Sequence, residues 1–189
     1  PEPKVLNLKN DFVSCNSKFF IDNILLSEIV LTLEPICKTL EIDFNSQDGI
    51  KIQYQYKKSD LEEYELNISK NNILILASSY EGRLYALISL LHLTFSSKGN
   101  LPLGIIQDKP RFNWRGMHLD CSRQFHSVQQ IKRLLNYMVL FKLNRFHWHL
   151  SDNEAWRLEV DSYPNLAKQS SFRGYHEIIP PVYGSGYNR

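Results

Sequence analysis

Six polar side chains of kinds that bind polar ligands or transfer protons follow two predicted strands in the second half of the chain. Their carboxylates and imidazole can exchange protons, and their guanidinium and hydroxyl groups can hydrogen-bond a polar ligand. In a (β/α) barrel the active site lies at the carboxyl ends of the strands, so these two groups should be neighbours in space. They are Asp120, Ser122 and Arg123 after the first strand, and His149, Ser151 and Asp152 after the second.

Arg123 has two interpretations. Its guanidinium can fork two hydrogen bonds to vicinal sugar hydroxyls or to a ligand carboxylate. It can equally form an ion pair with Asp120 or Asp152. The role of Asp152 also has several interpretations, because an Asp can orient a histidine, bind a hydroxyl or cap a turn.

His147 and His149 lie two residues apart on a predicted strand, so their side chains share one face. Paired histidines on a strand can bind zinc, which raises the hypothesis of a metal-dependent hydrolase. No set of Cys, His and Asp at ligand spacing accompanies them. The pattern therefore favours packed, hydrogen-bonded histidines over a metal site.

A strand, helix and strand position these residues. The strands are expected at about 114–119 and 144–150, and Ser127 and Gln130 form a capping box at the start of the helix between them. An apolar stripe at helical spacing follows. One βαβ unit implies parallel strands joined by a right-handed crossover. After Tyr163-Pro164 the pattern is that of a loop.

The first half of the chain shows a different pattern. Residues 50–56 and 64–68 alternate apolar and polar side chains, as half-buried strands do, and 64–68 should form a hairpin with 73–76. Residues 84–95 repeat at helical spacing after a capping box from Ser78 to Glu81. These features predict an α+β domain, a sheet with helices on one face, over residues 1–108.

An earlier helix is expected at about 26–40, and Pro35 inside it should kink or split it. Three cysteines, Cys15, Cys37 and Cys121, are too few for a disulfide framework. Three cysteines are compatible with either one disulfide bridge or three buried free thiols.

Charge changes sign along the chain near Asp108-Lys109-Pro110, which marks a predicted domain junction. Residues 1–108 carry 10 basic and 14 acidic side chains, net −4, and residues 109–189 carry 12 and 6, net +6. Hydrophobic residues make up 43% and charged residues 22%, as in globular proteins. Basic residues are interleaved with core-type segments, which argues against a nucleic-acid partner, and no apolar run is long enough for a membrane span.

Several motifs in order resemble the opening of a family 20 glycoside hydrolase, a β-N-acetylhexosaminidase. The resemblance covers about residues 110–173, and a looser one covers the small α+β domain that precedes the barrel. The motifs are Pro110-Arg111-Phe112-x-Trp114-Arg115-Gly116, Leu119-Asp120-x-Ser122-Arg123, Lys142-Leu143-Asn144-x-Phe146-His147-Trp148-His149-Leu150-Ser151-Asp152, Trp156-Arg157 and Tyr163-Pro164-x-Leu166.

The resemblance implies a (β/α)8 TIM barrel, incomplete in this chain, over residues 109–189. It implies release of terminal N-acetylglucosamine or N-acetylgalactosamine from glycans with retention, assisted by the substrate's own 2-acetamido group. By this resemblance, Arg123 matches the arginine that holds the sugar's 3- and 4-hydroxyls. Asp152 matches an acidic residue that supports the hydrogen-bond network of the active site, and His149 belongs to the same strand-end motif. Asn153 stands where the family often has a second Asp. No metal or organic cofactor is implied.

The catalytic Asp-Glu pair of the family lies on a later strand, and no adjacent Asp-Glu pair occurs in these 189 residues. We therefore expect the chain to be the front fragment of the enzyme, inactive alone and prone to self-association. The alternative is a non-catalytic carbohydrate-binding or interaction fragment. The family implies a secreted, periplasmic or lysosomal location, although no signal-peptide pattern opens the chain.

Overall fold

The computed structural model describes residues 3–152 and 155–171. Its chain forms two compact units, Pro1–Asn113 and Trp114–Arg189. The last strand of the first unit ends at Asp108, where the sequence predicts a junction.

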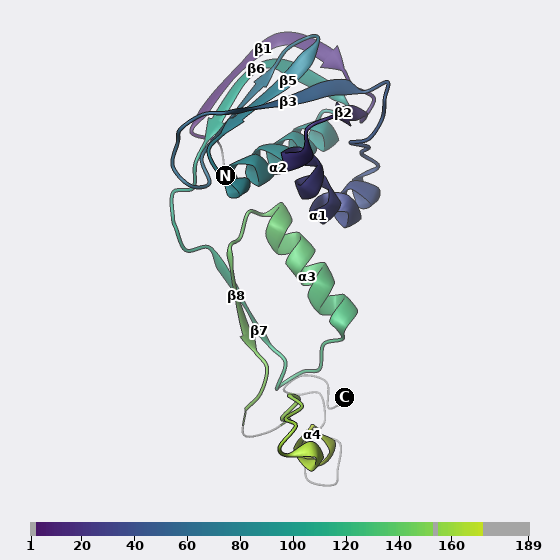
Figure 1. Cartoon of the computed structure of the whole chain (residues 1–189), viewed down its shortest axis with the longest axis vertical. Coiled ribbons are helices and arrows are strands. Elements are labelled where there is room, and N and C mark those ends of the chain that lie inside the picture. The colour runs from purple at the N-terminus through teal and green to yellow at the C-terminus, as the bar shows by residue number, and fades with distance from the viewer. Residues whose placement is uncertain (1–2, 153–154, 172–189) are drawn as a thin grey trace. The chain divides into compact units, whose positions relative to one another are not determined.

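The first unit is a mixed six-stranded sheet with two helices on one face (Figure 1). Its strand order is β1-β6-β4-β5-β3-β2. Helix α2 packs against β4, β5 and β6, and α1 packs beside α2. The predicted α+β sheet with helices on one side is confirmed. The elements are β1 (Val5–Ser14), β2 (Phe19–Ile21), α1 (Ile24–Leu40), β3 (Ile50–Tyr56), β4 (Tyr64–Ile68), β5 (Asn72–Ala77), α2 (Tyr80–Ser96) and β6 (Asn100–Asp108).

Period-two alternation builds the core of this unit. Leu66 on β4 is paired with Ile75 on β5 in the antiparallel hairpin that the sequence predicts. Both side chains are fully buried, as are Leu87 and Leu90 on α2. The intervening residues of β4 and β5 face the other side of the sheet and are only half-buried. Apolar burial on one face therefore sets the register, because a slip of one residue would reverse every side chain.

Two helix predictions need correction. Helix α1 runs without a break from Ile24 to Leu40, so Pro35 does not split it. Proline removes one helical hydrogen bond, and the buried apolar residues on both sides of Pro35 keep the helix packed. The N-cap of α2 is Ser79 and not Ser78: Ser79 Oγ accepts from Gly82 N at 2.9 Å, whereas the Ser78 hydroxyl donates to Ser59 O at 3.0 Å.

The second unit contains the predicted βαβ arrangement. Its elements are β7 (Gly116–Asp120), α3 (Val128–Leu140), β8 (Arg145–His149) and α4 (Pro164–Ser170). Strands β7 and β8 are parallel, and Asp120 is in register with His149. The capping box of Ser127 and Gln130 is present. Both strands therefore end at the same edge, as expected.

The loop predicted after Tyr163 is wrong, because α4 begins at Pro164. Pro164 stands at the start of this helix, a position that favours proline because no hydrogen bond of a backbone N–H is lost there. The three cysteines are buried free thiols, one of the two alternatives. Among the described residues, no helix is both long and apolar enough to cross a membrane.

Candidate functional site

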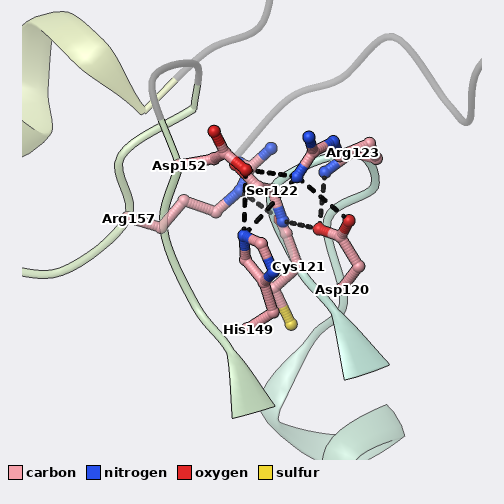
Figure 2. Close-up of polar contacts among 7 residues, drawn as sticks. All are labelled: Asp120, Cys121, Ser122, Arg123, His149, Asp152 and Arg157. Carbon is pink, nitrogen blue, oxygen red and sulfur yellow. Dashed lines mark hydrogen bonds and ion pairs between the residues drawn. The ribbon is translucent and has the colours of Figure 1, made fainter. Parts of the chain in front are cut away.

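Four of the predicted polar side chains converge where β7 and β8 end (Figure 2). Asp120 is the last residue of β7 and His149 the last of β8. The parallel ladder continues one step further, since Cys121 N donates to His149 O at 2.9 Å. Arg123 and Asp152 follow within three residues of the strand ends and turn toward one another. The sequence therefore predicted the site's location from the βαβ pattern.

Asp120 shapes the turn that carries Arg123. Its Oδ1 accepts hydrogen bonds from Ser122 N at 2.8 Å and from Arg123 N at 3.1 Å. Partial burial opposes ionisation of this carboxyl. The two backbone donors and the positive charge of Arg123 outweigh burial, so the pKa of Asp120 lies below its usual value. Asp120 is thus an ionised acceptor that fixes the backbone before Arg123.

Arg123 is held by two carboxylates. Its Nη1 forms an ion pair with Asp152 Oδ2 and lies 3.3 Å from Asp120 Oδ2. The hydrogen bond to Asp152, followed by the charge of Asp120, raises the pKa of Arg123. Both ion pairs considered from the sequence are therefore present. The Arg123 side chain remains 49% exposed, so the anchored guanidinium is still accessible from solvent.

Asp152 also joins His149 to the cluster. Asp152 Oδ2 lies 3.0 Å from His149 Nε2, and Arg123 Nη1 lies 3.4 Å from the same nitrogen. A carboxylate accepts hydrogen bonds, and a guanidinium only donates them. The arrangement suits the binding of hydroxyl groups better than proton transfer to a leaving group.

The histidines of β8 pack with a third histidine that the sequence reasoning missed. The ring of His118 on β7 lies 4.6 Å from that of His147 and 5.8 Å from that of His149, both edge to face. The rings contact one another, as packed histidines do, but His118 and His147 are exposed and His149 is only half-buried. Across residues 3–152 and 155–171, no three His, Cys, Asp or Glu side chains are grouped so that they could hold a metal ion.

Cys121, directly after β7, and Arg157, in the segment after β8, were not predicted as part of the site. Cys121 is buried, and its Sγ accepts from Trp148 Nε1 at 3.2 Å. Arg157 donates through Nε to Cys121 O at 2.8 Å. In the sequence, Arg157 appears only in the Trp156-Arg157 motif of the family resemblance. Its hydrogen-bond acceptors are backbone carbonyls, which leave no pattern in a sequence. Asn153 lies outside the described residues.

With this geometry in hand, comparison with known proteins identifies related chains. Residues 112–188 match the catalytic domain of glycosyl hydrolase family 20. A β-hexosaminidase of Vibrio furnissii is 43% identical over 122 residues, covering 64% of this chain and 20% of the relative. The N,N'-diacetylchitobiase of Vibrio harveyi is 37% identical over 128 residues, covering 65% of this chain and 14% of the relative.

Solved structures of the same family resemble nearly the whole chain. The GH20 exo-β-N-acetylglucosaminidase of Vibrio harveyi in complex with N-acetylglucosamine has a TM-score of 0.81 and 32% identity. The similar region covers 97% of this chain and 30% of the V. harveyi chain. The GH20 β-N-acetylhexosaminidase of Streptomyces coelicolor has a TM-score of 0.70 and 25% identity. Its similarity covers 88% of this chain and 37% of the S. coelicolor chain. The chain thus spans about a fifth of the V. furnissii relative and under two fifths of these structures.

Proposed function

Because this chain belongs to glycoside hydrolase family 20 through residues 112–188, we propose that the protein containing it is an exo-acting β-N-acetylhexosaminidase. Its substrates would be glycans and glycoconjugates that end in N-acetylglucosamine or N-acetylgalactosamine. The names of the curated relatives support this reaction, and a structural neighbour was solved with N-acetylglucosamine bound.

The architecture that goes with this function is a (β/α)8 barrel of which β7, α3 and β8 form the first βαβ part. The parallel pairing of β7 with β8 and the helix between them support this assignment. In such a barrel the carboxyl ends of the strands line the active site. Residues 1–108 would then form an accessory domain, and residues 109–189 the beginning of the catalytic domain.

The single observation that carries the proposal is the anchored, half-exposed guanidinium of Arg123 at the carboxyl ends of β7 and β8. We propose that Arg123 donates to the 3- and 4-hydroxyls of the terminal sugar. Asp152 supports it by fixing the guanidinium and His149, and Asp120 by fixing the backbone. The two carboxylates keep Arg123 in one orientation before the sugar arrives, which lowers the entropic cost of binding.

The family mechanism implies two further carboxylates. The 2-acetamido oxygen of the substrate attacks the anomeric carbon while an Asp orients the acetamido group. The adjacent Glu protonates the leaving group and later activates water, with overall retention. No adjacent Asp-Glu pair occurs among the 189 residues, so these groups would come from another part of the protein. By itself this chain would be inactive.

The missing Asp-Glu pair also favours a second candidate for the chain taken alone, a non-catalytic carbohydrate-binding fragment. Both proposals include binding of the terminal sugar, and only the first includes its hydrolysis. A binding fragment retains the terminal sugar without cleaving it, so binding of N-acetylglucosamine by the isolated chain, together with no hydrolysis by the complete protein, would favour this candidate.

The complete protein should be assayed with a chromogenic β-N-acetylglucosaminide and with the matched β-glucoside, which lacks the acetamido group. The proposal predicts hydrolysis of the first substrate only, because the second has no internal nucleophile. NMR of the first sugar released should show the β-anomer. Equal hydrolysis of both substrates, or release of the α-anomer first, would contradict the substrate-assisted mechanism.

A further inference from the structure

The backbone of Cys121 is held on both sides, at the point where β7 gives way to the turn that carries Arg123. Its N–H donates to His149 O at 2.9 Å, and its carbonyl accepts from Arg157 Nε at 2.8 Å. Cys121 is itself buried and only two residues before Arg123. A shift of this backbone would therefore move Arg123.

Arg157 connects three segments of the second unit. Besides Cys121 O, its Nη1 donates to Ser171 O at 2.8 Å, directly after α4. Its guanidinium also lies 5.5 Å from the centroid of the Phe125 ring, beyond the Asp120 turn. Figure 2 shows its side chain reaching across from the segment after β8 toward Cys121.

From these contacts, we infer that Arg157 is a positioning residue, which holds the backbone of the Asp120–Arg123 turn so that Arg123 meets the terminal sugar. This inference rests on the proposed function. Arg157 contacts backbone carbonyls and a ring in the described region, whereas the proposed sugar contact belongs to Arg123. Its effect on the sugar would therefore pass through Arg123.

The chemistry of this position suits arginine. Two carbonyls in different segments are reached from two nitrogens of one planar fork, a geometry that a single ammonium nitrogen cannot reproduce. Burial lowers the pKa of Arg157, yet a guanidinium remains charged at any physiological pH. The charge-assisted hydrogen bonds to the two carbonyls compensate part of the cost of burying it.

The test is a double-mutant cycle in the complete protein, with kcat/KM measured on a chromogenic β-N-acetylglucosaminide. The variants are Arg157→Gln, Arg123→Ala and the double variant, and Arg157→Lys serves as the conservative replacement. Arg145→Gln is the matched control, since Arg145 also donates to a carbonyl, Asn144 O at 2.9 Å, and lies 5.5 Å from the Trp114 ring, but at the opposite end of β8. Circular dichroism and melting temperature check folding of each variant.

Arg157→Gln should lower kcat/KM roughly tenfold in the wild-type background and less than about twofold in the Arg123→Ala background, because its effect passes through Arg123. Arg157→Lys should give an intermediate loss, and Arg145→Gln no loss. An equal fold-loss in both backgrounds, or a change in melting temperature with unchanged kcat/KM of folded protein, would overturn the inference. A wild-type protein without hydrolytic activity would instead refute the proposed function, so the two failures are distinguishable.

Discussion

The guanidinium of Arg123 forms an ion pair with the carboxylate of Asp152, and this contact joins the turn after β7 to the segment after β8. The same Asp152 oxygen also lies 3.0 Å from His149 Nε2, so one carboxylate orients two side chains. An exposed ion pair alone stabilises a fold by about 1 kcal/mol or less. In the proposed site, the main role of this ion pair would therefore be to orient Arg123 for the terminal sugar, and its contribution to the stability of the fold would be small.

Asp120→Asn should weaken the second unit at neutral pH and have little effect in acid. The folded pKa of Asp120 lies below its unfolded value, so its ionised form stabilises the fold above the unfolded pKa, and this stability is lost as pH falls through the folded pKa. Asparagine keeps an oxygen acceptor for the turn, so the change isolates the charge, which we expect to contribute about 0.5–1 kcal/mol at pH 7.

Urea unfolding followed by tryptophan fluorescence is the measurement for Asp120→Asn, because Trp114, Trp148 and Trp156 all lie in the second unit. The difference between wild type and variant should shrink between pH 7 and pH 3. A difference that stays constant over this range would mean that the carboxylate charge plays no part.

Gly82→Ala should destabilise the first unit, although alanine is the better helix former by about 1 kcal/mol. A Cβ at Gly82 would lie 2.5 Å from the backbone oxygen of Glu63, and a backbone atom cannot move aside cheaply. We expect a loss of roughly 1–3 kcal/mol from this overpacking. Ser96→Ala, at the exposed end of α2, is the matched control and should be neutral or stabilising. Far-UV circular dichroism during urea unfolding measures both, and a stabilised Gly82→Ala would contradict the contact.

Sequence periodicity was sufficient where one face of an element is buried. The β4–β5 hairpin and helix α2 follow from the spacing of apolar residues. The two parallel strands follow instead from the strand–helix–strand pattern, since neither β7 nor β8 has a buried residue. Strands β1 and β6 were not predicted, because β6 contains Pro102 and Gly104 and the register of the pair shifts between Leu8 and Phe12. Gly104 has φ of +145°, and a Cβ there would lie 2.2 Å from Asn7 O, so this pairing depends on a close approach invisible in local sequence.

The same distinction applies to the site. The convergence of Arg123, Asp152 and His149 was predictable, since parallel strands end at one edge. The contacts of Arg157 were not, because their acceptors are the backbone carbonyls of Cys121 and Ser171, which any residue could supply.

The 189-residue chain alone should not hydrolyse N-acetylhexosaminides. The carboxylates at its two strand ends, Asp120 and Asp152, face Arg123 and are unsuited to protonating a leaving group. Purified chain should give no release from a chromogenic β-N-acetylglucosaminide above that of a mock purification. Turnover that co-purifies with the chain through successive columns would refute this prediction.

The isolated chain should also self-associate. In the second unit, exposed apolar side chains include Val128 at 62% and Phe141 at 68% relative exposure, on and directly after α3, and large exposed apolar patches promote association. Size-exclusion chromatography with light scattering measures this directly. We expect a mass above 22.2 kDa that rises with concentration. A stable monomer would contradict the association alone and leave the other predictions in place.

The central claim is that Arg123 binds the terminal sugar of an N-acetylhexosaminidase, and the most direct test is kcat/KM of the complete protein and its Arg123→Ala variant on a chromogenic β-N-acetylglucosaminide. Each unpaired hydroxyl contact costs about 1–3 kcal/mol, and two are lost, so we predict weaker sugar binding, slower turnover and kcat/KM lower by roughly 30-fold or more. Arg133→Ala, which removes an exposed arginine from α3, should leave kcat/KM unchanged. Equal kcat/KM for wild type and Arg123→Ala would show that Arg123 only maintains the fold.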